Sequence, residues 1–263
     1  LNDVSETVGA VTLTSGSITV VTTGNTLTGT SYTLNPATGK TVTVSAILAG
    51  AVNLTKSDLG TANLSGVNTY SGTTTISQGT LAISNASALG SSSGTCVAAG
   101  SCASGTIVSN NAALSISGGI TVAEPIGTTG TGPASGGAIR FTSGDNTYSG
   151  PIYLTGISSY VSAGGKQIIS GTIDGAYGLT ISATDNLTLT GTIGATAPPS
   201  SLSVTTTGSG VLALNADIST SGTQSYTGAG GITINAARTL TGSTITTNSA
   251  LSGAYALTIT GNA

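Results

Sequence analysis

The sequence predicts an all-β chain that winds as a parallel β-helix, or β-solenoid, of roughly 20-residue coils. Three observations lead to this class. Short runs alternate apolar and polar residues, turn residues separate them at intervals of very roughly ten residues, and motifs recur at one period. Helices are excluded early, because Met is absent and no apolar stripe of helical spacing survives the frequent Gly, Thr and Val.

The alternating runs are the expected strands, each with one buried face. Gly, Asn-Thr, Asp-Gly and Ser-Gly turn signals stand between them. Stacked coils place Val, Ile, Leu and Ala in inward columns and Thr, Ser and Asn in outward ones, so we expect Ile181 and Ile259 inside and Thr188 outside. The expected strands are 18–21, 41–45, 73–76, 80–83, 179–181, 187–190 and 257–259.

Internal repeats favour a solenoid over a sandwich or barrel. The motif NTYSG occurs at 68–72 and 146–150, and SYTG follows at 225–228, while GAYGLTIS at 175–182 matches GAYALTIT at 253–260. A spacing of 78 positions fits four coils of about 20 residues or three of about 26, and we prefer four. The tyrosines that mark both series, which we interpret as structural, are Tyr70, Tyr148 and Tyr226, and Tyr177 and Tyr255.

Charge is scarce throughout the chain. Charged residues make up 5% of the 263 residues, against a usual share of about a quarter. The formal charge of −3 and the mean hydropathy of +0.34 are unlike those of disordered chains. No apolar run reaches the roughly 18 residues that a membrane-spanning helix needs. Without a Lys or Arg cluster, nucleic acid is excluded as an expected partner.

The two cysteines, Cys96 and Cys102, lie six positions apart between Gly-rich flanks. A local disulfide is the first interpretation, and it would contribute roughly 2 kcal/mol by closing so short a loop. Two free thiols are the alternative. A disulfide would indicate an oxidising compartment outside the cytoplasm.

No residues suggest catalysis, so we expect a protein that is not an enzyme and that needs no cofactor or metal. Without His, a serine nucleophile lacks its usual base, and Ser57 beside Lys56 is interpreted as a solvated turn. Gly164-Gly165-Lys166 lacks the rest of a phosphate-binding loop. The carboxylates are scattered, and those beside Gly or Asn are expected to bond their own turn backbone. The eight carboxylates are Asp3, Glu6, Asp58, Glu124, Asp145, Asp174, Asp185 and Asp217. The turn expectation applies to Asp145, Asp174 and Asp185.

Two stretches resemble known bacterial repeats. Residues 60–90, GTANLSGVNTYSGTTTISQGTLAISNASALG, resemble the passenger-associated repeat of autotransporters. Residues 146–263, with their period of 78, are similar to the repeats of filamentous-haemagglutinin-like adhesins. The resemblance implies a right-handed parallel β-helix that is exported through an outer-membrane translocator and displayed at the bacterial cell surface. It also implies adhesion, cell aggregation or extension of other modules.

We therefore expect residues 1–263 to form one continuous solenoid, a segment of a longer or tandemly repeated extracellular chain. Its expected function is that of an adhesin shaft or adhesive passenger. The expected partners are adjoining repeats or further copies, the translocator, and a host or neighbouring cell surface. The second hypothesis is a structural protomer of a filament or sheath, built by end-to-end or lateral β-packing. Ice binding by Thr columns is a distant third.

Overall fold

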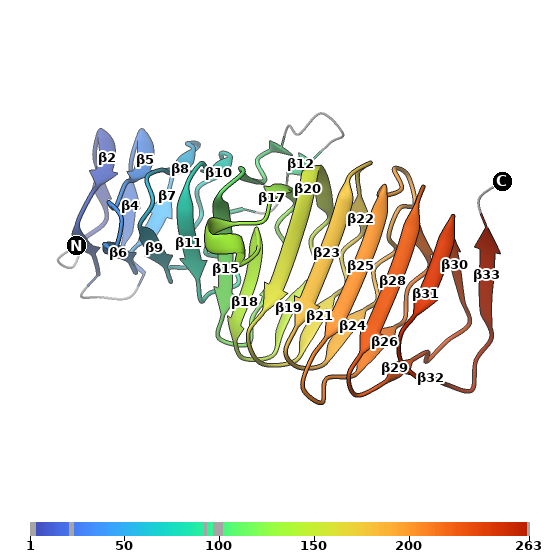
Figure 1. Cartoon of the computed structure of the whole chain (residues 1–263). Helices are drawn as coiled ribbons and strands as arrows, with labels where there is room; N and C mark the ends of the chain where they lie inside the picture. The colour runs from blue at the N-terminus through green and yellow to red at the C-terminus, as the bar shows by residue number, and fades with distance from the viewer. Residues whose placement is uncertain (1–3, 21–23, 92–93, 97–101, 262–263) are drawn as a thin grey trace.

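The computed structural model describes residues 4–20, 24–91, 94–96 and 102–261. Within them the chain forms a stack of coils, and nearly every strand pairs in parallel with strands one coil away (Figure 1). The single antiparallel pair among the described strands is β12 with β13. The predicted all-β parallel solenoid is confirmed.

Each coil has three faces, which the chain visits in the same order. Along face one lie β2 (Ala10–Leu13), β5 (Ser31–Leu34), β8 (Leu54–Lys56), β10 (Thr74–Ile76), β14 (Thr106–Val108), β17 (Ile126–Gly130), the first half of β20 (Ile152–Ser162), β22 (Ile173–Asp174), β27 (Ile218–Ser219), β30 (Arg238–Gly242) and β33 (Leu257–Gly261). Along face two lie β3 (Gly16–Ile18), β6 (Thr41–Val44), β9 (Thr61–Leu64), β11 (Gly79–Ile83), β15 (Ala112–Ser117), β18 (Ile139–Ser143), the second half of β20, β23 (Gly178–Ala183), β25 (Ser201–Thr206), β28 (Thr223–Gly228) and β31 (Thr244–Thr247).

Face three is made of shorter strands. They are β1 (Glu6–Thr7), β4 (Thr26–Thr28) and β7 (Ile47–Ala49), and further along the stack β16 (Thr121–Val122), β19 (Asn146–Tyr148), β21 (Gln167–Ile169), β24 (Leu187–Leu189), β26 (Leu212–Leu214), β29 (Ile232–Thr233) and β32 (Leu251–Ser252). Outside the three faces lie β12 (Thr95–Cys96), β13 (Cys102–Ala103) and one 3-10 turn, η1 (Pro133–Ser135). Six of the seven expected strands agree with these bounds to within two residues. The first, 18–21, overlaps β3 only at Ile18, and its residue 21 lies outside the described residues.

One column of paired residues on face one gives the coil length. Its members follow one another at steps of 19 to 32 residues, and most steps are close to the predicted 20. The column is Val11, Tyr32, Leu54, Thr74, Thr106, Ile126, Ile152, Ile173, Ile193, Ile218, Leu240 and Ile259.

Because some steps are longer than 20 residues, a spacing of 78 residues contains fewer coils than predicted. Tyr70 and Tyr148 each lie four residues before a member of this column, Thr74 and Ile152, which are separated by three coils. The preferred count of four coils was therefore wrong, because residues inserted between the column members lengthen this part of the chain. Tyr226 lies in β28 on face two, so the spacing from Tyr148 to Tyr226 is not a whole number of coils.

The motifs GAYGLTIS and GAYALTIT also lie on different faces, so their spacing of 78 residues is not a whole number of coils either. Ile181 of GAYGLTIS pairs on face two, whereas Ile259 of GAYALTIT pairs on face one. Ile181 is buried as expected, but Ile259 is 60% exposed. It belongs to an inward column, yet β33 is the last described strand of its face and no further coil covers it. Thr188 is more exposed than its buried neighbours in β24, in keeping with the expected outward position.

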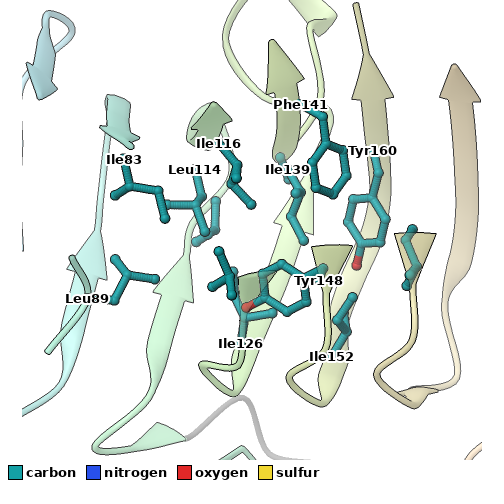
Figure 2. Close-up of a cluster of buried hydrophobic side chains, with 14 of the residues drawn as sticks. Ile83, Leu89, Leu114, Ile116, Ile126, Ile139, Phe141, Tyr148, Ile152 and Tyr160 are labelled. Carbon is teal, nitrogen blue, oxygen red and sulfur yellow. The ribbon is translucent and has the colours of Figure 1, made fainter. Parts of the chain in front are cut away.

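Burial alternates along the strands and creates one continuous core. Ile, Leu and Val fill most inward positions, and Figure 2 shows Tyr148 and Tyr160 inside the same cluster as Ile126, Phe141 and Ile152. Outward Thr residues form a column over four coils on face one, which ends where Ile107 and then Gly127 take the position. The column is Thr12, Thr33, Thr55 and Thr75.

Candidate functional site

The landmark tyrosines occupy two environments. Tyr70, Tyr148 and Tyr226 are fully buried, whereas Tyr177 and Tyr255 are 44% and 56% exposed at corners of the stack. Two further tyrosines that belong to no repeat, Tyr32 and Tyr160, are also buried in the core. The alternating run around Tyr32 could have indicated its inward position.

Each buried tyrosine hydroxyl has a hydrogen-bond partner inside the stack, as a polar atom removed from water requires. Three of the five partners belong to a neighbouring coil, those of Tyr32, Tyr148 and Tyr160. The five partners are the Ala49 carbonyl for Tyr32 (2.8 Å), Thr74 Oγ1 for Tyr70 (2.7 Å), the Glu124 carbonyl for Tyr148 (2.6 Å), Thr128 Oγ1 for Tyr160 (2.8 Å) and Gln224 Oε1 for Tyr226 (2.8 Å).

The NTYSG motif is explained by contacts between coils. Asn68 is buried, and its Oδ1 accepts a hydrogen bond from the Leu48 amide (2.8 Å) while its Nδ2 donates to the Ala88 carbonyl (2.6 Å). One side chain thus joins three successive coils. Gly72 allows a close approach, because a Cβ there would overlap the Val52 carbonyl of the coil before.

Four aspartates also join coils, and for three of them, Asp145, Asp174 and Asp185, this corrects the expectation that they bond their own turns. Their carboxylates accept hydrogen bonds from backbone amides 20 to 23 residues away: Asp145 from Lys166, Asp174 from Thr196 and Ala197, Asp185 from Gly165, and Asp217 from Thr239. Asp58 does bond locally, to the Leu59 amide. Asp3 lies outside the described residues.

Lys56 is not in a solvated turn, and that expectation was wrong. It is fully buried at an inward position of β8, and Nζ donates to the carbonyls of Ser57, Asp58 and Gln78 at 2.8 to 3.0 Å. Ser57 Oγ bonds Asn35 Oδ1 instead of the amine. The alternation Leu54-Thr55-Lys56 was the signal for an inward Lys56. Burial lowers the pKa of Lys56 to about 8, and nearby Asp58 opposes the shift.

Among the carboxyl groups in the described part of the chain, only that of Glu124 is buried. It is 3% exposed, and Oε2 has no hydrogen-bond partner in the described part of the chain. Burial raises the pKa of Glu124 to about 8, and the neighbouring Thr106 hydroxyl offsets the shift only in part. At neutral pH this carboxyl is therefore mostly protonated. Burial, with Glu124 as a further cause, also raises the pKa of Tyr70 and Tyr148.

The regular stack is interrupted by an insertion that carries the cysteines. The step from Thr74 to Thr106 is the longest of the column, and within it β12 and β13 form a disulfide hairpin joined by Cys96–Cys102. The hairpin lies beside the stack near β17 and β20 (Figure 1). Two glycines make room for it: a Cβ at Gly105 would lie 3.2 Å from Cys96 Sγ, and one at Gly127 would lie 3.2 Å from Cys102 Sγ.

A second insertion, loop 194–200, follows Ile193 on the same face. The Asp174 carboxylate holds it through the amides of Thr196 and Ala197, both at 2.9 Å. Its Ala-Pro-Pro sequence limits the backbone freedom of the loop. The disulfide hairpin and this loop thus border the same part of face one.

Between the two insertions lies a groove of about 460 Å³, the candidate functional site. Tyr153 and Asp174 are neighbours that continue the same outward column after Gly127, and both are half-buried. The groove is lined by Cys96, Pro151, Ile152, Tyr153, Thr172, Asp174, Thr196 and Ala197. Sequence reasoning had identified Cys96 and Asp174 but not Tyr153, because nothing in the chain pattern shows that two distant insertions flank it.

Among the residues that the structure describes, no three His, Cys, Asp or Glu side chains are grouped so as to hold a metal ion. The same residues include no helix with the length and apolar character required to cross a bilayer.

Comparison with protein families gives one match. Residues 54–83 match the passenger-associated-transport-repeat, which overlaps the predicted resemblance at 60–90 over residues 60–83 and begins six residues before it. The matched segment runs from β8 through β11 and contains Asn68, Tyr70 and Gly72. This match confirms the autotransporter passenger repeat and, with the solenoid, fits a passenger domain. Searches of curated proteins and of solved structures each found no match.

Proposed function

We propose that this chain is a non-enzymatic segment of an autotransporter passenger that is displayed on a bacterial surface and adheres to other surfaces. The observation that carries the proposal is the passenger-associated repeat at 54–83 inside a continuous solenoid. Each coil contacts mainly its neighbours, so a stack of similar coils can be lengthened by adding repeats and can extend away from the cell. A binding role is supported by the two insertions, because a plain spacer requires neither.

The test is made on the bacterium that produces the chain. Antibodies against residues 54–83 should label unpermeabilised cells, and deletion of the coding segment should reduce attachment of those cells to host cells or to one another. Labelling that requires permeabilisation would contradict surface display. Normal attachment by the deletion strain would contradict adhesion.

A second candidate, the protomer of an extracellular filament, is favoured by the two ends of the described stack. Val8, directly after β1 at one end, and the strand residues Leu251 and Ile259 at the other are exposed. Strand edges with exposed apolar residues pair readily with further strands. Electron microscopy separates the two functions, because a filament protomer gives regular fibres from purified chain, whereas a passenger gives single rods attached to cells.

A further inference from the structure

We propose that the groove between the disulfide hairpin and loop 194–200 binds a neutral glycan, a chain of uncharged sugar units. This inference rests on the proposed adhesive function and names the chemistry of its ligand. It starts from the placement of the insertions: they are far apart in sequence, yet both border Tyr153 and Asp174. Inserted loops on a rigid scaffold are where proteins place binding residues.

The groove is preformed, because hydrogen bonds hold each of its two walls against the stack. Cys102 of the hairpin is 4% exposed, and its carbonyl accepts a hydrogen bond from Thr73 Oγ1 at 3.0 Å. The Asp174 carboxylate fixes the opposite wall through Thr196 and Ala197. The walls therefore keep their separation without a ligand, which lowers the entropic penalty of binding.

The lining chemistry suits sugar hydroxyls. The hydroxyls of Tyr153 and Thr172 both donate and accept hydrogen bonds, and the carboxylate of Asp174 accepts them. Sugar hydroxyls offer the complementary set. The ring of Tyr153 also supplies an apolar surface for the C–H face of a sugar, as an aromatic residue with a polar end does at many interfaces.

Charge decides against acidic ligands. The groove carries the Asp174 carboxylate, and no Lys or Arg is among the described residues that line it. Two of the five cationic side chains in the chain are committed elsewhere, Lys56 to three carbonyls and Arg140 to the carbonyls of Pro133 and Gly137. A sulfate, phosphate or carboxylate in the groove would be repelled by the Asp174 carboxylate and would meet no cationic side chain there. The Asp174 carboxylate accepts hydrogen bonds from two backbone amides, which partly balance its charge. A cationic ligand is therefore not required.

The direction of the stack favours a linear chain. Successive coils are about 4.8 Å apart, close to the length of one sugar unit. On the far side of loop 194–200, a second groove of about 160 Å³ has no aromatic ring, but Thr192, Ser219, Thr239 and Asp217 supply hydroxyls and a carboxylate there. A glycan that follows the axis of face one meets a hydroxyl or carboxylate from several coils in turn.

The experiment titrates the purified polypeptide with oligosaccharides of glucose, galactose or mannose by isothermal calorimetry, beside sulfated and sialylated oligosaccharides and oligolysine. We expect saturable binding of a neutral series, weakened about tenfold or more by Tyr153→Ala and less by Tyr153→Phe, which keeps the ring. Asp174→Asn keeps an acceptor for loop 194–200 but removes the charge, so it should admit sulfated ligands that the natural chain rejects. Tyr255→Ala, at an exposed tyrosine outside the groove, is the matched control and should leave the affinity unchanged.

The proposal is overturned if the folded natural chain binds no neutral oligosaccharide, if Tyr153→Ala binds as well as the natural chain, or if a charged ligand binds best. Circular dichroism of each variant separates loss of binding from loss of fold. Cell attachment separates this proposal from the proposed function. If cells carrying Tyr153→Ala attach normally while cells lacking the chain do not, the glycan site is wrong and the adhesive passenger stands.

Discussion

Glu124 shows how a single residue in the stack connects pH to stability. Its folded pKa of about 8 lies above the ordinary 4.5 because the carboxyl is buried. Below pH 4.5 both the folded and the unfolded chain hold the proton, and the stability is fully present. As the pH rises from 4.5 to 8, the unfolded chain loses its proton while the folded chain keeps it, so the free energy of unfolding falls across this window.

We expect this fall to amount to roughly 2–4 kcal/mol, and Glu124→Gln to remove most of it. The check is urea unfolding of both chains at a series of pH values from 4 to 9. The titration of Lys56 falls in a different pH range. Its folded pKa is lowered from 10.5 to about 8, so it raises the free energy of unfolding between pH 8 and 10.5, above the range in which Glu124 titrates. Equal slopes for the two chains between pH 4.5 and 8 would assign the effect to other groups.

Asn68 acts through hydrogen bonds alone. Asn68→Ala leaves the Leu48 amide and the Ala88 carbonyl without their partner in a buried place, which should lower the free energy of unfolding by about 2–4 kcal/mol. Asn63→Ala, on the outward side of the neighbouring strand β9, should change it by less than about 0.5 kcal/mol. Chemical denaturation measures both, and similar losses at the two positions would contradict the bridging role.

At the scale of elements, strands could be predicted from the sequence and insertions could not. Alternation in runs such as Thr41–Val44 reflects a local property, since side chains of a strand point to opposite sides in turn. The positions of the disulfide hairpin and loop 194–200 depend on which coils become neighbours. That depends on the length of every coil between them, which no short motif records. The same limit explains why Tyr148 and Tyr226, with equal sequence spacing, lie on different faces.

The disulfide hairpin lies outside the column of coils, so breaking it should have a mainly local effect. Cys96→Ser with Cys102→Ser should lower the free energy of unfolding by no more than about 2 kcal/mol. Hydrogen exchange, followed by mass spectrometry, should rise in β12 and β13 and at Gly105, which lies against the disulfide. Faster exchange that spread through β10 and β14 would show that the hairpin supports the stack.

At the scale of the whole molecule, the stack is a repeating structure in which one coil replaces another only if the faces stay in register. Residues 181–203 make one whole coil on face two, because Ile181 and Val204 are neighbours in one column and Tyr160 precedes them. Removing this segment brings Val204 to the place of Ile181, against Tyr160. The coil order and the alternation of buried and exposed residues are then preserved along the rest of the chain.

We therefore expect the chain lacking 181–203 to fold as a shorter solenoid, with the same circular-dichroism spectrum per residue and a single cooperative unfolding transition of reduced enthalpy. Deleting only 181–191 is the matched control. It joins face two to residues of face one, moves inward side chains to solvent in every later coil, and should give an aggregated or unfolded product. If both deletions fold equally well, the column register would not determine this fold. If neither folds, the coils would not be interchangeable units and the stack would depend on contacts specific to each coil.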